Sequence, residues 1–352
     1  MKQRLHILLL SLCLTVSLTA EAASEDNERI DVKGIVLGHL GDAYDWHILT
    51  WNDRHISLPL PCIVYSEHSG WHLFLSSVFH HGTGRAHEGF FLNPDDNGKI
   101  YEYVDGTPVK PWDISITKDV LQIWIVAALL LFIFLHTARW YKYRDAGSPA
   151  PKGFTGFIEM FVMMINDEVI KGAIGEKHYR RFAPYLLTCF FFIFLTNLLG
   201  LLPIFPGGAN VTGNITITFF LSVCTFLVVN FSGNKEYWKE IFWPEVPTWL
   251  KAPVPIMPVI EFFGIFTKPF ALMVRLFANM LGGHAIILSL TCVIFITCQI
   301  GAGLGAPMTV TSFALMIFMN CLELLVAFIQ AYVFTMLSAI FIGLALPEHH
   351  GH

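Results

Sequence analysis

The sequence is organised around TKPFALMVRLFANMLGGHAIILSL, residues 267–290, in which one arginine, Arg275, interrupts a long apolar run. An arginine at the centre of a bilayer costs roughly 2.5–3.5 kcal/mol on insertion scales, and its guanidinium cannot lose its proton to avoid that cost. An arginine that snorkels from a helix end is the alternative, but apolar sequence continues well beyond Arg275. The stretch therefore predicts a functional site within a membrane protein.

Other polar residues share a face of the predicted helix with this arginine. Residues seven apart nearly eclipse on an α-helix, which aligns Glu261, Lys268 and Arg275, and Asn279 follows one turn later. His284 is expected to point roughly the opposite way. These residues form a polar stripe on an apolar helix.

The next apolar helix carries a second stripe, formed by Asn320, Glu323 and Gln330. Polar side chains that only hold helices together would account for Asn279 or Gln330 alone. They account poorly for a fixed cation accompanied by two carboxylates. The two stripes therefore indicate a route for an ion.

Several motifs give the chain a family resemblance. RLFANM from Arg275, preceded by Lys268-Pro269, and QAYVF from Gln330 resemble subunit a of the rotary (F-type) ATP synthase, as do NLLGLLPI from Asn197 and the position of Glu261. The resemblance covers residue 117 to the C-terminus. It implies a non-catalytic stator of a bacterial form, and we expect no cofactor and no metal. The added exported N-terminal domain departs from the family, whose members usually lack one. The partners that it implies are the c-ring, b-type peripheral stalk subunits, the soluble ATPase head reached through the stalks, and the lipid bilayer.

Helix rise assigns the polar residues to depths. His284 lies about 13 Å outward of Arg275, and Gln330 lies about 10 Å deeper than Glu323. We therefore expect His284 and Glu323 to line an outer half-channel, since the surroundings can shift the pKa of either side chain toward neutral pH. The family commonly has these two residue types exchanged, which suggests that the side chains touch.

The resemblance also assigns roles near the arginine. Arg275 is expected to act as an electrostatic gate beside a rotor carboxylate, with Asn279 and Gln330 orienting the guanidinium. Glu261 and Lys268 are candidates for the inner exit path. For Lys268, anchoring at the membrane interface is an equal alternative.

Composition agrees with a membrane protein. Hydrophobic residues make up 54% of the 352 residues and the mean hydropathy is +0.57, which suits several spans. A formal net charge of −5 argues against a nucleic-acid partner.

Residues 1–22 resemble a signal peptide, with Lys2, Arg4 and an apolar run before Ala20-Glu21-Ala22. A first transmembrane helix is the alternative, but the run is short for one.

Residues 24–116 differ in composition from the rest. Short aromatic and β-branched runs separated by Gly, Pro, Asn and Asp predict a small, mostly-β domain. Its histidines could suggest a metal site, but they form no ligand pattern on a clear element and no cysteine partners them as a ligand. We therefore expect no metal site there.

The remaining chain predicts a mainly α, polytopic membrane protein with about five transmembrane helices. Spans are expected at residues 120–135, 184–202 and 215–231, from Pro258 to about Cys298, and at 312–344, the last two long and tilted. Residues 154–174 predict an amphipathic helix at the membrane surface. Residues 117–346 are thus the expected stator domain.

Basic residues give the orientation. Arg139, Lys142 and Arg144 follow the first span, which places that end in the cytoplasm and the β block in the periplasm of a bacterial plasma (inner) membrane. Residues 347–352 are then a cytoplasmic tail.

Two other functions compete. An ion-coupled secondary transporter would have broken helices within repeated halves, and the sequence has no internal repeat. An intramembrane enzyme would require a catalytic set, but neither a Ser/His/Asp set nor a His-Glu-x-x-His motif occurs. The sequence does not distinguish H⁺ from Na⁺ as the coupling ion.

Overall fold

The computed structural model describes residues 38, 41–51, 54–82, 87–96, 98–104, 106–143, 151–202, 207–243, 256–300 and 302–346. The predicted signal peptide and C-terminal tail lie outside these residues. The chain divides into two compact units. One comprises Met1–His39 and Gly283–Leu322, and the other comprises Leu40–Gly282 and Glu323–His352.

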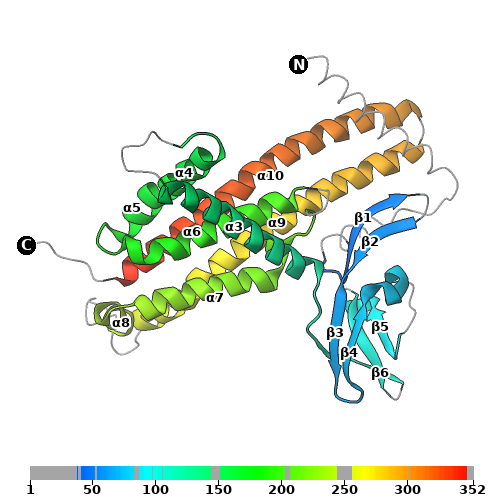
Figure 1. The fold of residues 1–352 in the computed structure, drawn as a ribbon, viewed down its shortest axis with the longest axis horizontal. Helices are drawn as coiled ribbons and strands as arrows, with labels where there is room; N and C mark the ends of the chain where they lie inside the picture. Colours follow the sequence, from blue (N-terminus) through cyan, green and yellow to red (C-terminus); the bar gives the residue numbers. More distant parts are fainter. Residues whose placement is uncertain are drawn as a thin grey trace, which may run out of the picture. The chain divides into compact units, whose positions relative to one another are not determined.

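The N-terminal block is built from short antiparallel sheets, as predicted (Figure 1). A hairpin joins β1 (Asp45–Trp51) to β2 (Arg54–Pro59). The second sheet has the order β4-β3-β8, and its strands are β3 (Pro61–Ser66), β4 (Gly70–Leu75) and β8 (Trp112–Asp113). The third has the order β5-β6-β7, with β5 (Phe90–Asn93), β6 (Lys99–Val104) and β7 (Thr107–Val109). Two 3₁₀ turns, η1 (Ser76–Gly82) and η2 (Pro94–Asp96), flank β5.

Alternation along β3 builds the core of this block. Cys62 and Val64 are fully buried and pack with Phe90 and Ile100, while their neighbours along the strand point to the other side. The turn between β3 and β4 ends at Gly70, whose φ of 84° is a left-handed conformation that glycine adopts without strain.

Five helices are long and apolar enough to cross a membrane, which confirms the predicted number for the part of the chain described. They are α3 (Lys118–Lys142), α6 (Tyr179–Gly200), α7 (Ile215–Ser232), α9 (Ile256–Ile300) and α10 (Ala302–Ala345). The last helix begins ten residues before the predicted start at residue 312. The glycines of that segment weaken a helix by about 1 kcal/mol each relative to alanine but do not prevent it.

The predicted surface helix is a helical segment of three parts. It consists of α4 (Phe154–Met164), a π-helical turn η3 (Ile165–Ile170) and α5 (Lys171–Ile174). Ile165 and Ile170 are fully buried in a core cluster that also contains Phe190 of α6 and Ile342 of α10. A short helix that was not predicted, α8 (Lys235–Phe242), follows α7.

The unit containing Gly283–Leu322 has its own packing. Cys292 and Ser312 are buried, and the Thr291 hydroxyl donates a hydrogen bond to the Met316 sulfur over 3.7 Å. These contacts join the parts of α9 and α10 that belong to this unit.

Candidate ion path

Arg275 lies on the exposed side of α9. Leu272, Leu276 and Met280 form the buried side of the same helix segment, whereas Arg275 and Asn279 are exposed. Within the described residues, the guanidinium forms no hydrogen bond or ion pair. The guanidinium is therefore an exposed charge on a largely apolar helix segment.

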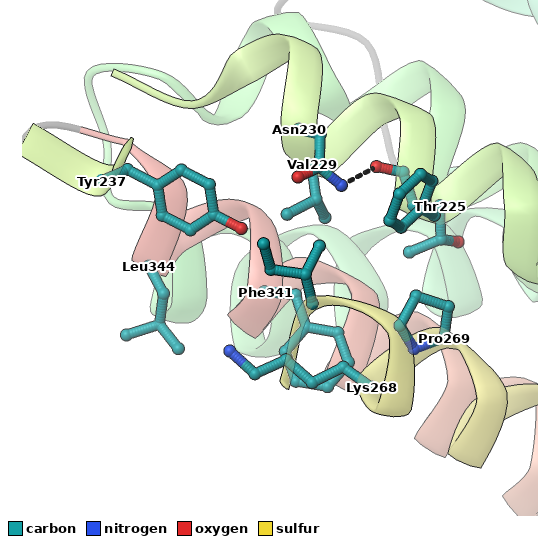
Figure 2. Close-up of a pocket in the computed structure, with 10 residues that line it drawn as sticks. Thr225, Val229, Asn230, Tyr237, Lys268, Pro269, Phe341 and Leu344 are labelled. Atoms are coloured by element: carbon teal, nitrogen blue, oxygen red, sulfur yellow. Dashed lines mark hydrogen bonds between the residues drawn. The ribbon is translucent and has the colours of Figure 1, made fainter. Parts of the chain in front are cut away.

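Lys268, one of the predicted inner residues, borders a small, partly open hollow. Figure 2 shows the hollow between α7, α8, α9 and α10, with the polar side chains of Asn230, Tyr237 and Lys268 around it. The Lys268 ammonium group lies 5.7 Å from the centre of the Phe341 ring. Most of the side chains that line the hollow are apolar, and its polar groups lie beside the helix that carries Arg275.

Glu261 is linked to the same hollow through Tyr237. Burial raises the pKa of Tyr237, and the nearby charge of Glu261 raises it further. The phenol therefore stays protonated and can donate a hydrogen bond. The structure thus brings Glu261, Tyr237 and Lys268 to one region, although only the first and last of them were predicted.

Two of the three predicted residues of α10 lie on its buried side, whereas Asn320 is exposed and donates a hydrogen bond to the Met316 carbonyl of its own helix. Glu323 and Gln330 are 3% and 7% exposed, and Ala327 and Ala331 share their side. Gln330 forms no hydrogen bond with Arg275 in the described part of the chain. The orienting role of Gln330 therefore stays a prediction.

Asn197 of α6 connects α10 to the loop before α7. Its amide nitrogen donates to the Ala327 carbonyl over 3.5 Å, and its amide oxygen accepts from the Thr212 hydroxyl over 2.6 Å. Ala327 lies one turn from Glu323, so this buried polar chain reaches the helix segment that carries the carboxylate. The sequence pointed to Asn197 only as part of a family motif and predicted no contact for it.

Asp119 and Gln122 extend the polar groups to α3. The Asn214 amide donates to the Asp119 carboxylate over 2.9 Å, and the Ala209 backbone N–H donates to the Gln122 side chain over 3.0 Å. Both side chains on α3 are buried. The signal that could have revealed them is a pair of polar residues at the very start of an apolar span.

His284 is half-buried in α9 and belongs to the unit of Gly283–Leu322, whereas Glu323 belongs to the other unit. Their predicted pairing stays a prediction. In the β block, His72 pairs with Glu88 over 2.9 Å. Among the described residues, no group of three or more His, Cys, Asp or Glu side chains could hold a metal ion.

Comparison with known proteins adds independent findings. A family model described as the ATP synthase A chain matches residues 120–343. A second, described as a domain of unknown function (DUF8433), matches residues 35–114. ATP synthase subunit a of Chloroherpeton thalassium is 44% identical over 253 residues, which cover 68% of this chain and 71% of the relative. Subunit a 2 of Chlorobaculum tepidum is 46% identical over 256 residues, covering 69% and 68%.

A third relative bears on the N-terminal block. ATP synthase subunit a of Anaeromyxobacter sp. is 38% identical over 349 residues, which cover 94% of this chain and 74% of the relative. That alignment must include most of the β block, so the block has a counterpart in a related subunit. From the matched region and the charge pattern of α9, the chain belongs to the ATP synthase A chain family, the proton-channel stator subunits of the membrane sector.

Proposed function

We propose that this subunit carries protons to and from the rotor through two separate half-channels, with Arg275 as the gate between them. The observation that supports this most directly is the exposed guanidinium of Arg275 in an apolar helix, without an ion pair among the described residues. Such a charge has the position needed to meet a carboxylate on a neighbouring protein.

The outer half-channel would follow the buried polar groups between α3, α6 and α10. Asp119, Asn214, Thr212 and Asn197 supply carboxylate, amide and hydroxyl groups that can pass or hold a proton through bound water. This chain of groups leads to the segment of α10 with Glu323. Glu323 is then the last titratable group before the rotor on this side.

The inner half-channel would be the hollow beside Lys268. Its opening to solvent supports access for water, and Tyr237 and Asn230 supply hydrogen-bonding groups. Glu261 lies close enough to influence the pKa of Tyr237. We assign the exit of the proton to this space.

Arg275 would separate the two paths electrostatically. A rotor carboxylate must be neutral while it faces lipid, but a cation within a few ångström lowers its pKa and favours the ionised form. The carboxylate therefore releases its proton on one side of Arg275 and takes up another on the other side. The transmembrane potential supplies about 2.3 kcal/mol per charge for each 100 mV.

The partners follow from this role. The exposed side of α9 with Arg275 would face the c-ring, and b-type stalk subunits would connect this non-catalytic subunit to the soluble ATPase head. The protein would lie in the bacterial plasma membrane, with the β block in the periplasm and the C-terminus in the cytoplasm. Lys142 and Arg139 at the end of α3 support that orientation.

Replacement of Arg275 tests the proposal. In proteoliposomes containing the whole complex, Arg275→Ala should abolish ATP-driven acidification, measured with a pH-sensitive dye, because nothing then ionises the rotor carboxylate. Arg275→Lys should also fail, because a compact ammonium does not reproduce the planar, multidentate guanidinium. As a matched control, Arg139→Ala removes an exposed arginine from the end of α3 and should retain pumping. Full ATP synthesis by the Arg275→Ala complex would contradict the assignment.

A further inference from the structure

One side of the β4-β3-β8 sheet is apolar along its length. In the β3–β4 pairing, Tyr65 lies opposite Trp71 and Ile63 lies opposite Leu73. Residues two apart along a strand point to the same side, so these four side chains share one face of the sheet. The rings of Tyr65 and Trp71 are 5.0 Å apart.

The third strand continues this face. Trp112 lies opposite Tyr65, and the Ile114 N–H donates to the Ile63 carbonyl over 3.0 Å. The pairing extends past β8, because the Ile116 N–H donates to the Pro61 carbonyl over 3.1 Å. We call the side of the sheet that carries Ile63, Leu73 and Ile114 the apolar face.

No described residue covers the apolar face. The outer strands present Trp71, Leu73, Leu75, Trp112 and Ile114, whose exposed fractions range from 51% to 75%. A tryptophan has up to about 250 Å² of surface, so these five side chains together expose on the order of 600 Å². That equals or exceeds the largest apolar patch of a typical soluble monomer. An uncovered surface of this size indicates a contact with another molecule.

The opposite side of the same sheet is the core of the β block. Cys62 and Val64 are fully buried there, against Phe90 and Ile100. The sheet is therefore already packed on one side, and its apolar face is a second, additional apolar surface. Folding of the block does not explain why that face lacks polar residues.

The chain leads directly from this face into a membrane-spanning helix. Ile116 lies two residues before Lys118, the first residue of α3, a distance of about 7 Å in extended chain. Exposed apolar side chains continue on α3, beginning with Trp124. The face is thus continuous in sequence with a helix that is long and apolar enough to cross a membrane.

We propose that the apolar face docks on the phospholipid surface of the membrane, on the side where α3 begins. Tryptophan and tyrosine side chains concentrate at the boundary between lipid headgroups and hydrocarbon, and three of them form one row of this face. Among the described residues of the three strands, the face carries no charged side chain, so binding rests on apolar burial and does not require anionic lipid. Side chains that follow one another on this face are about 7 Å apart along each strand. The sheet must therefore lie along the membrane surface for all of them to make contact.

Site-specific photo-crosslinking tests this proposal in the intact complex. The crosslinking amino acid benzoylphenylalanine at Leu73 sits at the centre of the face, and illumination in native membranes should yield phospholipid adducts that mass spectrometry identifies. The same amino acid at Lys110, an exposed position on the loop after β7, should yield far fewer adducts. A crosslink from position 73 to a protein, or a yield of lipid adducts no higher than at position 110, would overturn the proposal.

Tryptophan quenching gives a second measurement that does not depend on an unnatural residue. The emission of Trp71 and Trp112 is the difference between the spectrum of the protein and that of its Trp71→Phe/Trp112→Phe variant. In proteoliposomes of phosphatidylcholine brominated near the headgroup end of its acyl chains, the lipid should quench this emission. Trp124→Phe, on the exposed side of α3, serves as the lipid-facing reference. A difference spectrum that iodide quenches and brominated lipid does not would place these rings in water and contradict the proposal.

Discussion

At the scale of the residue, Asn197 is a buried amide that satisfies two partners at once. Asn197→Ala would leave the Thr212 hydroxyl and the Ala327 carbonyl without this partner, at a cost of about 1–3 kcal/mol. We expect a lower melting temperature of the purified protein, followed by intrinsic fluorescence, and slower ATP-driven proton uptake in proteoliposomes. Thr188→Ala is the control, because that exposed hydroxyl bonds only within its own helix. An unchanged melting temperature for Asn197→Ala would show that the bonds contribute little.

Cys62 carries a second prediction at this scale. Burial, with a smaller contribution from the charge of Asp113, raises the pKa of the Cys62 thiol to about 12. Since the pKa is raised, the thiol stays protonated up to a higher pH than an ordinary cysteine, and at pH 7 the reactive thiolate is about one part in 10⁵. A maleimide should therefore leave Cys62 unmodified in the folded protein and label it after denaturation, as measured by peptide mass spectrometry. Ser77→Cys, an exposed position nearby, should be labelled without denaturation.

At the scale of the element, the segment from α4 to α5 is held against α10 by a close backbone approach. A Cβ added at Gly343 would clash with the Ala173 carbonyl oxygen, and the backbone would have to move to relieve the clash. Gly343→Ala should therefore separate α10 from α5 and lower the melting temperature of the protein. Gly172→Ala offers a matched control, because a Cβ there meets nothing within 4 Å. Equal melting temperatures for the two variants would contradict this packing.

The elements also show what the sequence could reveal. Hydropathy predicted the five spans, because apolar runs of this length have few other uses. The early start of α10 was missed, because glycine lowers helix stability without excluding it. The π-helical turn at Ile165–Ile170 was missed as well, since its side chains have the same apolar spacing that an α-helix would have.

The candidate site could be predicted only in part for a similar reason. Arg275 and Glu323 are conspicuous, since a charge in an apolar run needs an explanation. Asn197, Gln122 and Tyr237 are uncharged or lie at helix ends, where polar residues are ordinary. Their importance depends on which neighbour each one meets across different helices, and spacing along one helix carries no such information.

At the scale of the whole molecule, the distribution of basic residues predicts the orientation in the membrane. Lysines and arginines gather at the end of α3, before α6 and in α8, which we place in the cytoplasm. In intact spheroplasts, a membrane-impermeant maleimide should label Ser77→Cys in the β block but not Glu176→Cys in the loop before α6. Permeabilisation should expose the second site. Labelling of Glu176→Cys from outside would reverse the orientation.

The length of α10 has a consequence for how groups pass along it. Its apolar part, Met308–Ala345, has 38 residues and is about 57 Å long, whereas the hydrocarbon layer is about 30 Å thick. A helical segment longer than the layer is thick must run obliquely to stay within it. A group that follows the surface of this helix therefore moves sideways in the plane of the membrane as well as across it.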